Sequence, residues 1–249
     1  MIANAVRKAL QLLGYEINRL NAGLSAEELS ILSKVTDFTM TSPQRLVALM
    51  DAVNYVVRNR IEGDIVECGV WRGGSMMAAA HSLNALNDQS RHLYLFDTFE
   101  GMTAPTGKDA VFSGDSAQDI LDKTRKVEGP GIWAYASLGD VQRNLGTTGY
   151  PQDRIHFVKG DVCETVPNQA PEKIAILRLD TDWYESTRHE LLHLYPRLAA
   201  NGILIIDDYG HWKGAREAVD NYFADSRLKP LFNRLDYTGR LIVKPHGDE

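Results

Sequence analysis

Residues 174–182 read IAILRLDTD, a short apolar run that ends in two acidic residues. The apolar part lacks strict alternation with polar positions, which is typical of a strand buried on both faces of a parallel sheet. Four more stretches share this character and are also rich in Ile, Val and Leu: Asp64–Val70, His92–Phe99, Ile155–Val162 and Asn201–Asp207. Together the five runs predict a largely parallel sheet.

Longer segments with apolar residues at helical spacing separate these runs. They predict crossover helices over residues 75–86, 116–126, 138–145 and 183–198, with another over 212–223 and two weaker strands near 228–234 and 240–243. This βαβα order indicates an α/β fold with a doubly wound, mostly parallel sheet. In such sheets ligands bind at the carboxyl ends of the strands.

The first 60 residues predict helices only. Ser25 to Glu28 form a capping-box sequence, Ser42 and Pro43 are typical of a helix start, and Ile2, Val6, Leu10 and Leu13 recur at helical spacing. We therefore expect a helical extension over residues 1–60, acting as a lid and dimerisation region, and a catalytic domain over 61–249. The amphipathic N-terminal pattern favours a homodimer or a higher homo-oligomer.

Composition excludes several classes of protein. The net charge of −6 over 249 residues argues against a nucleic-acid partner, which usually needs clustered Lys and Arg. The two cysteines cannot build a disulfide framework. The longest apolar runs have about five residues, against roughly 20 for a membrane span. We expect a soluble cytoplasmic protein with no membrane partner.

The acids and glycines at the first strand ends favour a nucleoside cofactor. The turn after the first run reads ECGVWRGGS over residues 67–75, which lacks the G-x-G-x-x-G spacing of a dinucleotide site. Asp97 ends the second run, where a carboxylate can accept from a ribose diol, and Asp161 follows the third. An acidic pocket without a diphosphate cradle fits S-adenosylmethionine, which carries a ribose, an adenine and a cationic sulfonium.

Four carboxylates end the last two parallel runs: Asp180 and Asp182, then Asp207 and Asp208. In extended chain Asp180 and Asp182 share a face, whereas Asp207 and Asp208 converge only where the strand has turned into its loop. Such a cluster needs a cation among its members. Because all the ligands are oxygens, the cluster predicts a hard cation, Mg²⁺.

Five segments carry a family resemblance: VECGVWRGGS (66–75), DTFEGM (97–102), LRLDTDWYESTRHEL (177–191), LYPRL (194–198) and IIDDYGHWKGAREAVDNY (205–222). They resemble the macrocin O-methyltransferase (TylF-like) family, sugar-tailoring enzymes of macrolide and aminocoumarin biosynthesis, from about residue 36 to residue 222. The resemblance implies a Rossmann-like class I methyltransferase sheet, S-adenosylmethionine as methyl donor and a requirement for Mg²⁺.

The same likeness implies roles for individual residues. Asp180, Asp207 and Asp208 would bind the metal, and Asp182 would be the general base. The donor would be held by Glu67, Gly69, Ser75 and Asp97, helped by Thr39, Met40 and Thr41. Their places at the ends of the second and third runs, and not the likeness, add Thr98 and Asp161 to the expected donor site. Independently, an aliphatic hydroxyl attacks a methyl sulfonium poorly unless a metal lowers its pKa and a carboxylate takes its proton.

We therefore expect a Mg²⁺-dependent O-methyltransferase whose acceptor is a small hydroxylated natural product, with a sugar hydroxyl beside a second oxygen as the target. Two alternatives stay open: a catechol-type methyltransferase acting on an aromatic diol, and a non-catalytic protein that binds S-adenosylmethionine. The Gly-, Thr- and Pro-rich segment 101–116 is typical of a lid or binding loop. His211 is interpreted either as an acceptor contact or as an ordinary loop histidine.

Overall fold

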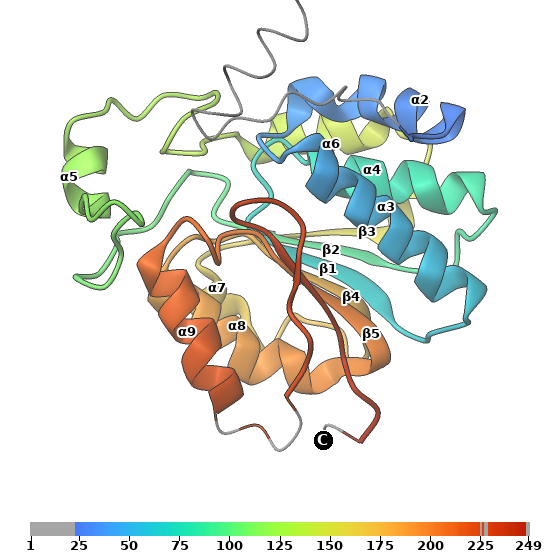
Figure 1. Ribbon diagram of the computed structural model, residues 1–249. Coiled ribbons are helices and arrows are strands. Elements are labelled where there is room, and N and C mark those ends of the chain that lie inside the picture. Colours follow the sequence, from blue (N-terminus) through green and yellow to red (C-terminus); the bar gives the residue numbers. More distant parts are fainter. Residues whose placement is uncertain (1–22, 225, 227–228, 248–249) are drawn as a thin grey trace, which may run out of the picture.

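A seven-stranded sheet forms the centre of the protein (Figure 1). The computed structural model describes residues 23–224, 226 and 229–247. The strands lie in the order β3-β2-β1-β4-β5-β7-β6, and β7 runs antiparallel to both of its neighbours, β5 and β6. Their bounds are β1 Asp64–Cys68, β2 Leu93–Asp97, β3 Ile155–Lys159, β4 Ile174–Leu179, β5 Leu198–Ile206, β6 Asn233–Arg234 and β7 Arg240–Val243.

Helices cover both faces of this sheet (Figure 1). One layer contains α2 (Ala26–Val35), α3 (Pro43–Arg58), α4 (Gly74–Ala85) and α6 (Leu138–Gly146), and the other contains α7 (Val162–Thr165), α8 (Tyr184–Leu194) and α9 (Lys213–Ala224). The short helix α5 (Ala117–Asp122) lies apart from both layers. The described part of the chain also contains three 3₁₀ turns: η1 Thr36–Phe38, η2 Gln152–Arg154 and η3 Tyr195–Arg197.

The strands are apolar on both sides because each side packs on a separate core. On β5, Ile203 and Ile205 pack with α2, α3 and α4, whereas Leu204 and Ile206 pack with α8 and α9. Successive side chains of a strand point to opposite faces, so a strand covered on both faces needs an uninterrupted apolar run. Residues of α2 and α3 share the first of these cores with the sheet.

The structure confirms the predicted α/β class and the doubly wound, mostly parallel sheet. The helix expected over 183–198 ends at Leu194, before Pro196, and β5 begins at Leu198, earlier than predicted. Tyr195 keeps helical backbone angles, and the chain continues beyond α8 as the 3₁₀ turn Tyr195–Arg197. Pro196 has no N–H to continue the α-helical hydrogen bonds, which explains this boundary. The helix expected over 116–126 spans only Ala117–Asp122.

One expectation concerns residues outside the described ranges. The amphipathic pattern at residues 2–13 lies there, so the homodimer inferred from it stays a prediction. Among the described residues, no helix is both long enough and apolar enough to cross a membrane.

The strand order places the functional site. Successive strands run outward from β1 to β2 and β3 on one side, and from β4 to β5 on the other. A crevice opens where the order reverses, at the carboxyl ends of β1 and β4. Both acidic sequences, at residues 180–182 and 207–208, follow strands beside this point.

Candidate active site

A cavity occupies this crevice and collects segments from most of the chain. Its lining combines residues before α3 with the loops that follow all five parallel strands and the β6–β7 hairpin: 39–41, 45, 69–71, 75, 96–98, 101–103, 134, 160–162, 178, 180–182, 186, 207–208, 211 and 237–238. Twelve of the thirteen predicted site residues belong to this lining. The exception is Glu67.

The glycine-rich turn after β1 is fixed by the chain around it. Gly69 has a φ of +82°, and a Cβ atom there would lie 2.0 Å from the Asp180 carbonyl oxygen, so only glycine fits. The carboxylate of Asp97, at the end of β2, accepts hydrogen bonds from the backbone N–H groups of Val70, Trp71 and Phe99. Asp97 therefore shapes the predicted donor turn as well as lining the cavity.

The other predicted donor residues surround this turn. Thr39, Met40 and Thr41 approach it from the segment before α3, and the Thr41 hydroxyl accepts from Arg178 at 2.7 Å. Ser75 lies in the first turn of α4. Asp161 caps α7 by accepting from the backbone N–H of Cys163, and the Thr98 hydroxyl donates to the Gly101 carbonyl oxygen.

Glu67 has a different environment from the one the sequence suggested. It faces Arg178 across the β1–β4 pairing, is 1% exposed and forms an ion pair with that guanidinium. Burial raises the pKa of Glu67 to about 7, against the opposing effect of the Arg178 charge. Glu67 does not line the cavity, and its contact with the donor stays a prediction.

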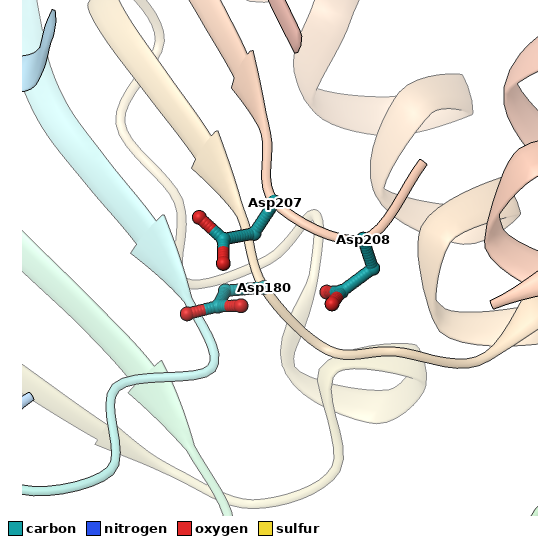
Figure 2. A group of neighbouring side chains, drawn as sticks. All are labelled: Asp180, Asp207 and Asp208. Carbon is teal, nitrogen blue, oxygen red and sulfur yellow. The ribbon is translucent and has the colours of Figure 1, made fainter. Parts of the chain in front are cut away.

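Asp180, Asp207 and Asp208 converge at the ends of β4 and β5 (Figure 2). Each offers a carboxylate oxygen, and these three atoms lie within 4.8 Å of one another. β5 ends at Ile206, so Asp207 and Asp208 lie in the bend after the strand. The two side chains can converge only because the chain has left the extended conformation there. One oxygen of Asp208, Oδ2, is buried without a hydrogen-bond partner among the described residues. An all-oxygen set with an unpaired buried acceptor fits a hard divalent cation.

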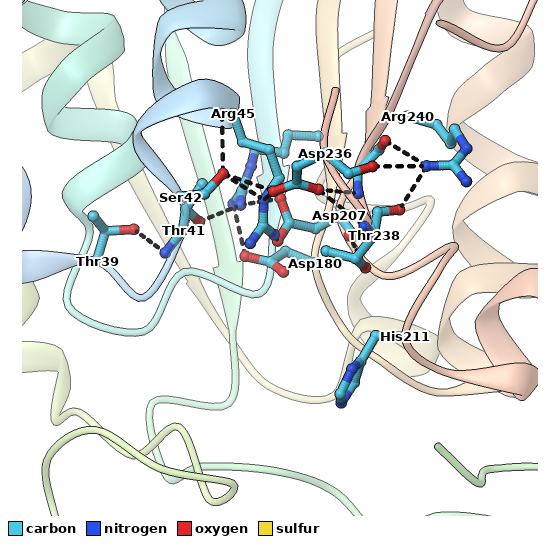
Figure 3. Close-up of polar contacts among 12 residues, drawn as sticks. Thr39, Thr41, Ser42, Arg45, Asp180, Asp207, His211, Asp236, Thr238 and Arg240 are labelled. Carbon is cyan, nitrogen blue, oxygen red and sulfur yellow. Dashed lines mark hydrogen bonds and ion pairs between the residues drawn. The ribbon is translucent and has the colours of Figure 1, made fainter. Parts of the chain in front are cut away.

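Two arginines, Arg178 and Arg45, balance the carboxylates in the structure; Figure 3 labels Arg45 with Asp180 and Asp207. Arg178 reaches Asp180 at 2.8 Å and Asp207 at 2.6 Å. Arg45, from the first turn of α3, forms a second ion pair with Asp207. The two guanidinium groups therefore supply part of the positive charge that the acid cluster was expected to need. Arg178 could be suspected from its place two residues before Asp180, but Arg45 lies 135 residues upstream and carries no local signal.

Asp182 leaves the strand geometry on which its predicted orientation rested. Its φ is +68°, so the backbone is no longer extended and the two-residue periodicity that would align it with Asp180 does not apply. Its carboxyl group instead lies near Asp208 and Trp212, and both neighbours affect its pKa. Burial, supported by the Asp180 charge, raises the pKa of Asp182 to about 7, and burial with the Asp182 charge raises that of Asp208 well above its usual range.

The predicted loop 101–116 is anchored beside the site. The Asp109 carboxylate accepts from the Tyr184 N–H at the start of α8 and from the Thr106 backbone N–H. A Cβ atom on Gly214 would lie 2.0 Å from that carboxylate, so α9 also packs closely on the loop. Gly101, Met102 and Thr103 contribute the cavity-lining part.

A polar rim was also missed by sequence reasoning. Tyr237 and Thr238 line the cavity from the β6–β7 hairpin, and Tyr237 Oη lies 3.2 Å from Nδ1 of His211. His211 itself lines the cavity, and burial, with the nearby Arg45 charge, lowers its pKa. The sequence pattern for the two strands near 228–234 and 240–243 was weak, so it did not predict that the turn between them reaches the site.

Known proteins resemble this chain in sequence and in fold. The mycinamicin III 3''-O-methyltransferase of Micromonospora griseorubida is 35% identical over 184 residues, covering 74% of this chain and 69% of that protein. An 8-demethyl-8-(2,3-dimethoxy-alpha-L-rhamnosyl)-tetracenomycin-C 4'-O-methyltransferase of Streptomyces olivaceus is 34% identical over 201 residues, covering 81% and 73%. The solved structure of the O-methyltransferase NovP superposes with a TM-score of 0.73 at 29% identity, covering 84% of this chain and 83% of that one.

The fold and site define a class I S-adenosylmethionine-dependent O-methyltransferase. The model of the macrocin O-methyltransferase (TylF) family matches residues 32–244. The chain belongs to that family, as its motifs predicted.

Proposed function

We propose that the protein transfers a methyl group from S-adenosylmethionine to a sugar hydroxyl of a natural product, with Mg²⁺ held by Asp180, Asp207 and Asp208. The observation that carries this proposal is the convergence of these three carboxylates beside Asp182, within the cavity that the donor-site residues line. The named activities of the two relatives, on a mycinamicin and on a rhamnosyl tetracenomycin, support a sugar-bearing acceptor.

In this proposal the donor lies over the turn after β1. The free N–H groups at the start of α4 and the hydroxyls of Thr39 and Ser75 offer hydrogen bonds to its polar groups, while Asp97 and Asp161 offer acceptors at the ends of β2 and β3. The acidic lining also suits the positive sulfonium.

The acceptor then lies between the donor and the acid cluster. Asp180, Asp207 and Asp208 would hold Mg²⁺, which would lower the pKa of the acceptor hydroxyl. Asp182 takes the hydroxyl proton; without the metal, burial raises the pKa of Asp182 to about 7. The loop 101–103 and His211 close the remaining sides and exclude water from the reacting oxygen.

A methyl-transfer assay with two acceptor types tests the proposal. A glycoside with neighbouring hydroxyls should be methylated with Mg²⁺ and not with a chelator, and a catechol should react far more slowly. Asp207→Asn should bind the donor but lose metal-dependent turnover, whereas the matched change Asp220→Asn on the exposed face of α9 should behave as the wild type.

Three results would contradict parts of this reading. Catechol as the better substrate would favour the aromatic-diol alternative. Full turnover in the chelator would reject the metal. Donor binding without transfer to any hydroxyl of either acceptor would favour the non-catalytic alternative.

A further inference from the structure

Arg45 joins the acid cluster to two other parts of the chain (Figure 3). Its side chain is 11% exposed and pairs with Asp207 through Nη1. A different nitrogen, Nε, donates to Asp236 Oδ2 at 2.9 Å, and Ser42, the N-cap of α3, donates to the same Asp236 oxygen at 2.7 Å. Arg45 thus has an anchor in the β6–β7 hairpin that does not depend on Asp207.

Asp207 is the most heavily engaged of the three carboxylates. Its Oδ1 accepts from Arg178 and its Oδ2 from Arg45, so both oxygens contact guanidinium groups. Asp180 has an ion pair to Arg178 through Oδ2 alone, and Asp208 has a buried Oδ2 with no partner in the described part of the chain. A cation that approaches the cluster therefore meets its strongest competition at Asp207.

The two arginines are not equivalent competitors. Arg178 is 4% exposed and pairs with Glu67, Asp180 and Asp207, so its loss would remove one ion pair from each of three acids. Arg45 pairs with one member of the cluster only, and its Nε contact with Asp236 can persist if Nη1 is displaced. Of the two arginines, Arg45 can therefore lose its contact with Asp207 with the smaller loss of folding stability.

We infer that Arg45 is a positioning residue that competes with the divalent cation for Asp207: it neutralises the empty site and holds metal affinity below what the carboxylates alone would give. This inference rests on the proposed metal site. The physical reason is that a unit positive charge a few ångströms from a divalent cation repels it strongly in a poorly screened site. Metal binding then exchanges the Nη1 contact for a metal bond while Asp236 retains the side chain.

Titration of the donor-free protein with Mg²⁺ and Mn²⁺, followed by calorimetry, tests the inference without any turnover. Arg45→Gln removes the charge and should tighten binding roughly tenfold or more. Arg45→Lys keeps the charge and should stay near the wild type. The matched control Arg216→Gln removes an exposed charge on α9 and should change nothing.

The outcomes separate this inference from the proposed function. Equal or weaker binding by Arg45→Gln, with wild-type binding intact, overturns the competition and makes Arg45 a support for Asp207 as ligand. Binding by Arg45→Gln alone supports competition strongly. Binding by neither protein overturns the metal site and the inference together.

A second measurement needs only protein that folds as the wild type does. The ¹⁵N signals of the Arg45 guanidinium, assigned by their loss in Arg45→Lys, should shift when metal is added to the wild type. Unchanged signals at saturating metal would show that Nη1 keeps its contact with Asp207, and would overturn the exchange.

Discussion

The carboxyl groups of Asp182 and Asp208 lie near each other, and the Asp182 charge raises the cost of ionising Asp208 because two ionised carboxylates repel. Because the pKa of Asp182 is raised to about 7, the group is largely protonated in mild acid and cannot then accept a proton from the substrate. We expect kcat/KM to fall as pH drops below 7. Asp182→Asn should reduce kcat by about 10²–10⁴-fold, the usual contribution of a general base.

The measurement is a pH profile of methyl transfer in both proteins, with donor affinity as the control. A flat profile from pH 5 to 8, or wild-type rates in Asp182→Asn, would remove the base assignment.

The stability of the folded protein should depend on pH in the opposite direction. The folded-state pKa of Asp182 is raised, so its favourable contribution is complete below about pH 4 and is lost as pH rises through 7. Without metal, Asp182→Asn should therefore gain melting temperature relative to the wild type between pH 5 and pH 8.

The sequence was enough to predict which acidic residues gather at the candidate site, but not which arginines form ion pairs with them. Asp180, Asp207 and Asp208 follow adjacent strands, and that alone brings them together. Glu67 instead meets Arg178 because the register of β1 against β4 places them side by side, and register is not visible in one sequence. Arg45 reaches Asp207 through tertiary packing of α3, which periodicity does not specify.

At the scale of elements, the loop after β2 and helix α8 stabilise each other through one side chain. Asp109 is 2% exposed and accepts from the first N–H of α8 and from the Thr106 N–H and hydroxyl. Asp109→Ala leaves these donors unpaired in a buried place and should lower the free energy of unfolding by about 1–3 kcal/mol.

Urea denaturation of the full chain measures this loss. Asp122→Ala, at the exposed end of α5, removes an acid that accepts only from Gln118 among the described contacts and should change stability by less than about 0.5 kcal/mol. If the two variants unfold alike, the loop is not held by Asp109.

Element boundaries show where sequence reasoning succeeds. Short apolar runs without strict alternation identified all five parallel strands, although β1 contains Glu67 and β3 contains His156. The hairpin β6–β7 was weaker, since β6 spans only Asn233–Arg234 and both residues are exposed. Its turn, which brings Tyr237 and Thr238 to the cavity, was therefore not expected at the site.

At the scale of the whole molecule, the cavity is lined from residue 39 to residue 238, so a bound donor contacts segments that separate on unfolding. S-adenosylmethionine at 100 times its Kd should stabilise the fold by about 2.7 kcal/mol, which corresponds to a rise of roughly 5–10 °C in Tm. Differential scanning fluorimetry measures the shift. ATP is the control, because the turn at residues 67–75 lacks a diphosphate cradle; no shift with the donor, or an equal shift with ATP, would contradict the assigned cavity.

The C-terminal hairpin has a consequence for synthesis on the ribosome. Until residue 243 has been made, β5 lacks its antiparallel neighbour β7 and presents an open edge to other strands. Over the same interval Arg45 has no Asp236 to receive its Nε–H. When the five parallel strands have been translated, the nascent chain still lacks Tyr237 and Thr238, which line the cavity. We therefore expect the protein to become able to transfer methyl groups only after β7 has been made.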